Sequence, residues 1–204
     1  MSNRRKNNVL EKLVKDLQVA QYHLMDFDRL KQDLTGKGYG VEVLKESSPF
    51  NPAYALVSRV SIGGFDFTVK SFDDQTHSDK IIYGNPEALR LIGLVDSIAT
   101  IRSTFLIEQF GGGVMPGASS YLRVAVNDYQ DGPTITTALS RGDINISEIN
   151  GLFNNFYRDI RDIGGGTKGF HLTGLQERMY NEFILINSRK MVLTDHAHLI
   201  LFNR

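Results

Sequence analysis

Apolar residues recur near the start of the chain at alternating spacings of three and four residues, the repeat of a helix with one narrow apolar stripe. This repeat predicts a helix over about Asn7 to Leu34 that carries a heptad seam. A seam of this width becomes buried only against a partner, either another helix of the same chain or a second copy of the molecule. The candidate interface, a coiled-coil seam, comprises Leu10, Leu13, Leu17, Ala20, Leu24 and Phe27.

A glycine-rich segment at 36–40 ends this helix, and the signals that follow it are those of strands. Val41 to Lys45 is β-prone and predicts a short strand. Two further β-prone runs, 55–62 and 65–71, flank Gly63-Gly64, and two glycines suit a tight hairpin because both turn positions tolerate positive φ. Apolar and polar residues alternate in the second run, so one face of the predicted hairpin is buried.

The longest apolar stretch follows Asn85 and Pro86, which suit the cap and the first turn of a helix. Its apolar residues cover more than one side of a helical projection, and a helix of that kind lies inside a fold. The stretch therefore predicts a buried central helix over about 86–110. Charged residues interrupt the stretch, which excludes a membrane span.

The second half of the chain predicts one more helix and several short strands. Asn145 followed by Glu148 matches a capping box and predicts a third helix over about 147–163, with its apolar residues on one side. Residues 175–187 suit either a helix or a strand, and periodicity alone does not decide between them. Short apolar runs predict four further strands, at 121–126, 133–139, 191–194 and 199–202.

Together these segments predict an α+β fold with a long N-terminal helix and a hairpin-rich mixed or antiparallel sheet packed on a buried central helix. The predicted organisation has two parts. Residues 1–35 form the heptad-patterned helix for assembly or docking, and residues 36–204 form a single α+β domain.

The composition narrows the classes of function. The chain has 204 residues, of which 41% are hydrophobic, as in globular proteins. Its 23 basic and 23 acidic residues give a formal net charge of zero. That balance argues against a surface devoted to nucleic acid or to anionic membranes, and it permits self-association because little charge repulsion separates the copies.

The absence of cysteine excludes disulfides, thiolate metal sites and cysteine nucleophiles. Residues 1–9 are polar and basic and lack the apolar segment of a secretory signal. We therefore expect a cytoplasmic or virion-associated protein that is not secreted. The glycine-rich segments follow predicted helices and lack the spacing of a phosphate loop, so nothing in the sequence predicts a cofactor.

Two polar clusters are candidates for metal binding. Asp73, Asp74 and His77 lie in one predicted loop, and oxygen ligands with an imidazole suit Mg²⁺ or Mn²⁺. On a strand, His196 and His198 would point to the same side and would chelate one metal ion if a carboxylate supplied a third ligand. A solvated turn is the simpler explanation of each cluster. We expect both clusters at exposed turns, too far apart to share an ion.

The favoured hypothesis is a non-enzymatic structural, assembly or protein-interaction component, of the kind found among phage and viral structural or accessory proteins. It associates with itself or with another protein through the N-terminal helix, and we expect no membrane partner. The alternative is a metal-dependent hydrolase or nuclease that uses the Asp73–Asp79 loop with His196 and His198. A nucleic-acid-binding protein that uses the basic N-terminal residues Arg4 to Lys6 is a weaker alternative.

Overall fold

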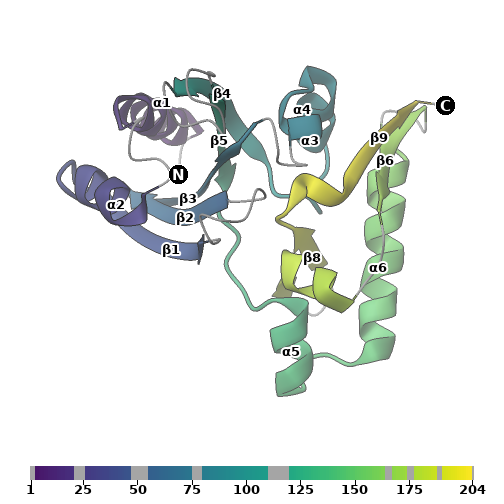
Figure 1. The fold of residues 1–204 in the computed structure, drawn as a ribbon. Helices are drawn as coiled ribbons and strands as arrows, with labels where there is room; N and C mark the ends of the chain where they lie inside the picture. Colours follow the sequence, from purple (N-terminus) through teal and green to yellow (C-terminus); the bar gives the residue numbers. More distant parts are fainter. Residues whose placement is uncertain are drawn as a thin grey trace. The chain divides into compact units, whose positions relative to one another are not determined.

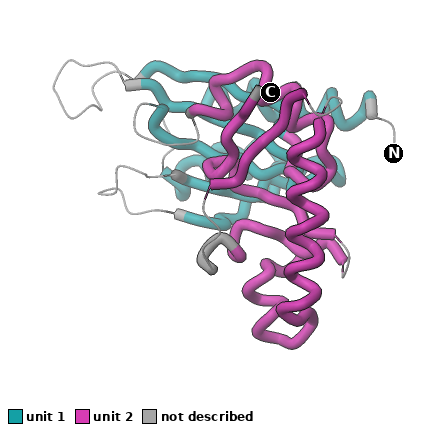
Figure 2. The backbone as a smooth tube through the Cα atoms, turned by 90° about the vertical axis from the view of Figure 1, so that its right-hand side faces the viewer, with its two compact units in different colours: residues 1–80, 101–129 teal, residues 81–100, 130–204 magenta. Residues whose placement is uncertain are grey.

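The computed structural model confirms an α+β fold and divides the chain into two compact units. Unit 1 comprises residues 1–80 and 101–129, and unit 2 comprises residues 81–100 and 130–204 (Figure 2). This division differs from the predicted one, in which residues 36–204 formed a single domain. The structure describes residues 3–20, 26–46, 55–74, 80–109, 120–163, 167–173, 177–187 and 190–203.

Unit 1 is built on a five-stranded antiparallel sheet with the strand order β1-β2-β3-β5-β4 (Figure 1). The predicted hairpin is confirmed: β2 pairs with β3 through a turn at Gly63 and Gly64, whose φ angles of 61° and 81° favour glycine. The strands are β1 (Gly40–Glu46), β2 (Ala55–Ile62), β3 (Phe65–Asp73), β4 (Ile101–Gln109) and β5 (Ser120–Asp128).

Two helices stand where the heptad pattern predicts one. The N-terminal helix α1 (Asn3–Val19) is present, but a second helix, α2 (Phe27–Thr35), begins after Asp26. Asp26 has an extended backbone, with φ −120° and ψ 103°, and its side chain accepts a hydrogen bond from the Arg29 backbone N–H. An N-cap of this kind starts a new helix, so the predicted single helix was too long. Residues 21–25, which include Leu24 of the seam, lie outside the described residues.

The core of unit 1 lies between one face of the sheet and the two helices (Figure 1). Side chains alternate across a strand, so every second residue of β2, β3 and β5 contributes to this face. The buried cluster includes Leu13 and Leu17 from α1, Leu30 and Leu34 from α2, and the sheet residues Leu56, Val60, Phe67, Val69, Leu122, Val124 and Val126.

The predicted central helix over 86–110 was wrong. Its first part is the short helix α4 (Pro86–Ile92), capped by Asn85 as expected, and its last part is the strand β4. Gly93 follows α4 at its C-cap, and β4 contains the β-branched and aromatic residues that favour strands. Apolar residues covered more than one side of the helical projection because the run joins a helix to a strand.

Unit 2 packs helices against two antiparallel ribbons. The capping-box prediction is confirmed, because Asn145 and Glu148 exchange side-chain-to-backbone hydrogen bonds at the start of α6. Phe156 of α6 meets Phe183 edge to face, with ring centroids 5.0 Å apart. The helices are α3 (Lys80–Tyr83), α4, α5 (Ile135–Arg141) and α6 (Ile146–Arg161), and the ribbons pair β6 (Lys168–Leu172) with β9 (Leu199–Asn203) and β7 (Phe183–Asn187) with β8 (Lys190–Leu193).

In two other segments the structure corrects a predicted strand or decides between a helix and a strand. Residues 133–139, predicted as a strand, contain most of α5, because the Thr134 side chain accepts from the Thr137 N–H and caps a helix. The segment 175–187, left open by the sequence, has a 3₁₀ helix over Glu177–Glu182 followed by β7. None of the described helices is both long and apolar enough to cross a membrane.

Candidate functional site

The heptad seam is the first candidate, and most of its described residues lie in the core of unit 1. Leu13 and Leu17 are fully buried and Ala20 is nearly so, all within the cluster formed by α1, α2 and the sheet. Leu10 and Phe27 are partly buried and pack against that cluster. The chain's own sheet therefore buries Leu13 and Leu17, which places these two side chains beyond the reach of a second molecule.

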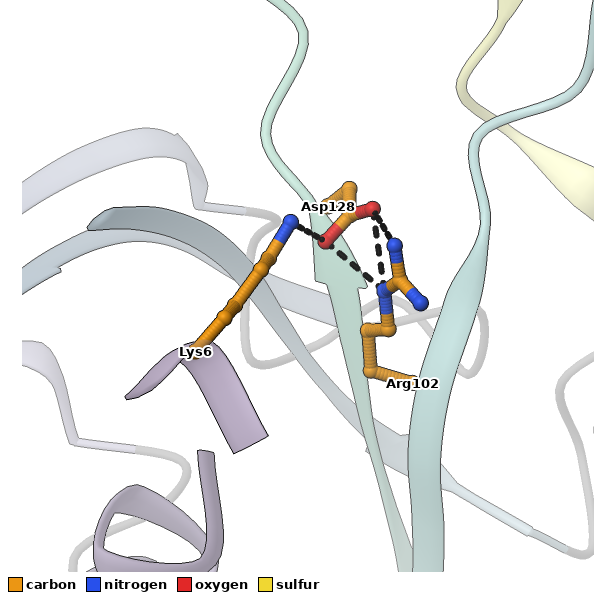
Figure 3. A network of polar contacts seen from close by, with 3 residues as sticks. All are labelled: Lys6, Arg102 and Asp128. Carbon is orange, nitrogen blue, oxygen red and sulfur yellow. Dashed lines mark hydrogen bonds and ion pairs between the residues drawn. The ribbon is translucent and has the colours of Figure 1, made fainter. Parts of the chain in front are cut away.

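Charged contacts also hold α1 on its sheet. Figure 3 shows the carboxylate of Asp128, at the end of β5, between Lys6 of α1 and Arg102 of β4. Lys6 Nζ lies 2.7 Å from Asp128 Oδ1, and Arg102 Nε lies 3.0 and 2.9 Å from the two carboxylate oxygens. Burial acts to raise the pKa of Asp128, but the hydrogen bonds from Arg102 and Lys6 outweigh it and hold the pKa below its ordinary value. A carboxylate held in this way stabilises the fold and is poorly suited to proton transfer.

His196, a candidate metal ligand, is a buried structural residue of unit 2. It lies in the 3₁₀ turn η3 (His196–His198) and is fully buried, so the expectation of an exposed turn was wrong for this residue. Its Nε2 lies 2.9 Å from the carbonyl oxygen of Ala99, which only accepts, so Nε2 carries the proton. Nδ1 then accepts from the Tyr83 hydroxyl at 2.8 Å. Both ring nitrogens are engaged, which leaves neither for a metal ion.

The other proposed ligands do not form a three-ligand group in the described residues. His198 Nε2 lies 3.0 Å from a carboxylate oxygen of Glu182. Asp73 ends β3 and Asp74 follows it, and the Asp74 carboxylate is paired with Arg123. His77 and the remainder of its loop lie outside the described residues. Across the described ranges, no three His, Asp or Glu side chains are arranged to hold a metal ion.

The free edge of β4 is the feature of unit 1 that best fits a binding role. In the described part of the chain β4 pairs with β5 alone, so its outer edge offers backbone N–H and C=O groups to a further strand. After an irregularity between Ile101 and Ser103, the pairing runs without interruption from Ser103 to Gln109. Leu106, in the middle of this stretch, is 48% exposed.

The other edge of the sheet, β1, is less suited to receive a strand. Its pairing with β2 is interrupted between Val43 and Lys45, and three of its seven residues are charged. Bulges and charges are the devices by which proteins protect sheet edges from pairing with other chains. The uninterrupted stretch of β4 carries a single charged residue, Glu108. The two edges therefore differ, and β4 is the open one.

Comparison with protein-family models found no match for this chain, and no curated protein matches its sequence. The candidate site consequently rests on the geometry of the chain itself. The sequence pattern did not reveal the β4 edge, because the apolar run over 86–110 predicted a helix for these residues. The available signal was the run from Ser103 to Glu108, whose β-prone residues fit a strand as well as a helix.

Proposed function

We propose that this protein is a non-enzymatic component of a protein assembly and that it associates through the free edge of β4. The observation that carries the proposal is the edge of β4, which is uninterrupted from Ser103 to Gln109, has no strand on its outer side among the described residues, and carries a half-exposed leucine, Leu106, at its middle. Strand addition at such an edge uses main-chain hydrogen bonds for affinity and alternate side chains for specificity. We therefore assign the association to β4 and not to the heptad seam, because the central leucines of the seam, Leu13 and Leu17, are buried inside the fold.

A second copy of the chain is the partner that β4 fits best. An antiparallel pairing centred on Leu106 keeps to the uninterrupted stretch and places Ser103 of each copy opposite Gln109 of the other, since both residues lie three positions from the centre. Such a pairing is self-complementary, as a two-fold dimer requires, and the zero net charge of the chain does not oppose it.

The test compares matched substitutions on the two edges of the sheet. Leu106→Lys places a charge at the centre of the proposed pairing, and Val43→Lys places the same charge on β1, where the side chain is 40% exposed. We expect the parent and Val43→Lys to dimerise with rising concentration, and Leu106→Lys to remain monomeric, in sedimentation equilibrium. Two results would contradict the proposal. The first is a parent that stays monomeric and does not bind an added peptide with the β4 sequence, and the second is an equal mass of Leu106→Lys and Val43→Lys.

A further inference from the structure

Unit 2 contains a surface depression of about 340 Å³, bounded by α6, the start of β8 and the residues that follow α4. Its apolar lining consists of Leu152, Phe156 and Met191, which are at most 5% exposed and form its floor. This volume lies near the lower end of the range of about 300–1,000 Å³ found for ligand pockets. Because these residues are almost fully buried, the depression offers only a small apolar contact area, beside polar groups of about equal area.

Four charged side chains surround this floor, two of each sign. Helix α6 contributes Arg158 and Asp159, and the facing segments contribute Asp96 and Lys190. All four residues are exposed, and within the described chain none of them forms an ion pair. Arg158 donates a hydrogen bond of 3.1 Å to the neutral side chain of Asn155, which also lines the depression. The four charges sum to zero and none is neutralised by the chain.

Ser97 adds an unsatisfied polar group to the same lining. The residue is 4% exposed, and its hydroxyl oxygen is buried with no hydrogen-bond partner among the described residues. Its carbonyl oxygen accepts from the Leu193 N–H at 3.0 Å, so the backbone is fixed in place. Buried hydroxyls usually have a partner because an unmade hydrogen bond is costly. Within the described chain this hydroxyl keeps its full hydrogen-bonding capacity, and Ser97 belongs to the lining of the depression.

We propose that the depression binds a small zwitterion with an apolar side chain, the chemical class of free apolar amino acids and dipeptides. The ligand's ammonium group lies against Asp159, its carboxylate against Lys190, and its side chain on the apolar floor, while Asp96 and Arg158 supply the second charge of each sign. A phosphate or a bare metal cation fits this site less well, because each would face two charges of its own sign. This binding function goes beyond the proposed association through β4 and rests on different residues.

The test is a titration of the full chain with phenylalanine and, separately, with the dipeptide leucyl-phenylalanine, followed by NMR chemical shifts. We expect the chemical shifts of the backbone amides of 152–159 and 190–191 to change saturably with at least one of the two ligands. The ligand that binds more tightly shows whether the depression prefers an amino acid or a dipeptide. Because a hydrogen bond between charged groups is lost, Asp159→Asn and Lys190→Met should each weaken binding about tenfold. N-acetyl-phenylalaninamide, which lacks both charges, should not bind.

The matched control is Asn154→Lys, which changes the charge of α6 by the same amount as Asp159→Asn at an exposed residue that does not line the depression. This variant should keep the affinity of the parent. Three results would overturn the proposal: no saturable shifts with either ligand, equal binding of the uncharged analogue, or an equal loss of affinity in Asn154→Lys and Asp159→Asn.

Discussion

At the scale of the residue, His196 shows how much one buried polar side chain contributes to unit 2. Replacing it by alanine leaves a cavity and removes one hydrogen bond to the Tyr83 hydroxyl and one to the Ala99 carbonyl. We expect His196→Ala to lower the free energy of unfolding by about 2–5 kcal/mol, the range for large core truncations. Tyr83→Phe, which removes only the hydrogen bond between the hydroxyl and Nδ1, should cost about 1–3 kcal/mol. Urea denaturation measures both, and a cost below about 1 kcal/mol for His196→Ala would contradict the assigned role.

The lowered pKa of Asp128 predicts how the free energy of unfolding depends on pH. Its pKa is lower in the folded chain than in the unfolded chain, so its contribution is complete above the ordinary carboxyl pKa of about 3.9 and is lost as the pH falls through the folded value. Asp128→Asn should therefore lower stability at pH 7, by about 1–3 kcal/mol, and reduce the further loss below pH ~4. Asp143→Asn, at an exposed residue, is the charge-matched control. Equal pH profiles for the parent and Asp128→Asn would refute this assignment.

At the scale of the element, the sequence predicted the segments whose signals lie within a few residues. The Gly63-Gly64 turn and the capping box at Asn145 act locally, and both predictions are confirmed. The run over 86–110 failed because its helical and β-prone parts are contiguous and both are apolar. The open edge of β4 depends on the order of all five strands, and the depression joins Asp96 to Lys190 across distant parts of the chain. No local pattern encodes either arrangement.

Replacing glycine by alanine should have opposite effects on stability at two positions of unit 2, Gly169 and Gly151. A Cβ on Gly169 of β6 would lie 2.5 Å from the Arg161 carbonyl oxygen and 2.8 Å from that of Ile160, so the strand and the end of α6 would have to separate. We expect Gly169→Ala to cost about 1–3 kcal/mol. A Cβ on Gly151, inside α6, would meet no neighbouring atom within 4 Å, and Gly151→Ala should stabilise by about 0.5–1 kcal/mol. Thermal unfolding compares them, and the same sign for both would disprove the packing argument.

At the scale of the whole molecule, the chain alternates between its two units. Residues 81–100 of unit 2 lie in the sequence between β3 and β4, which belong to one sheet. Within unit 1, the N-terminal helices α1 and α2 contribute four leucines to the core: Leu13, Leu17, Leu30 and Leu34. Removing residues 1–35 would uncover the apolar face of that sheet. Because residues 1–35 complete the core of unit 1, we expect that residues 36–204 do not fold normally without them.

The leucines of the seam and the exposed leucine of β4 are expected to have different roles, which two substitutions can separate. Leu17 is fully buried in unit 1, so Leu17→Ala should lower the free energy of unfolding by about 2–5 kcal/mol, while the protein that remains folded keeps the mass of the parent. Leu106→Lys, at a half-exposed residue, should leave the folded monomer stable and should lower the mass to that of a monomer. Because association with a partner stabilises the native state by mass action, the melting temperature of a self-associating parent rises with protein concentration. In Leu106→Lys it should be independent of concentration, with the mass of a monomer. If Leu17→Ala instead gives a monomer whose melting temperature no longer depends on protein concentration, the interface lies on the N-terminal helix.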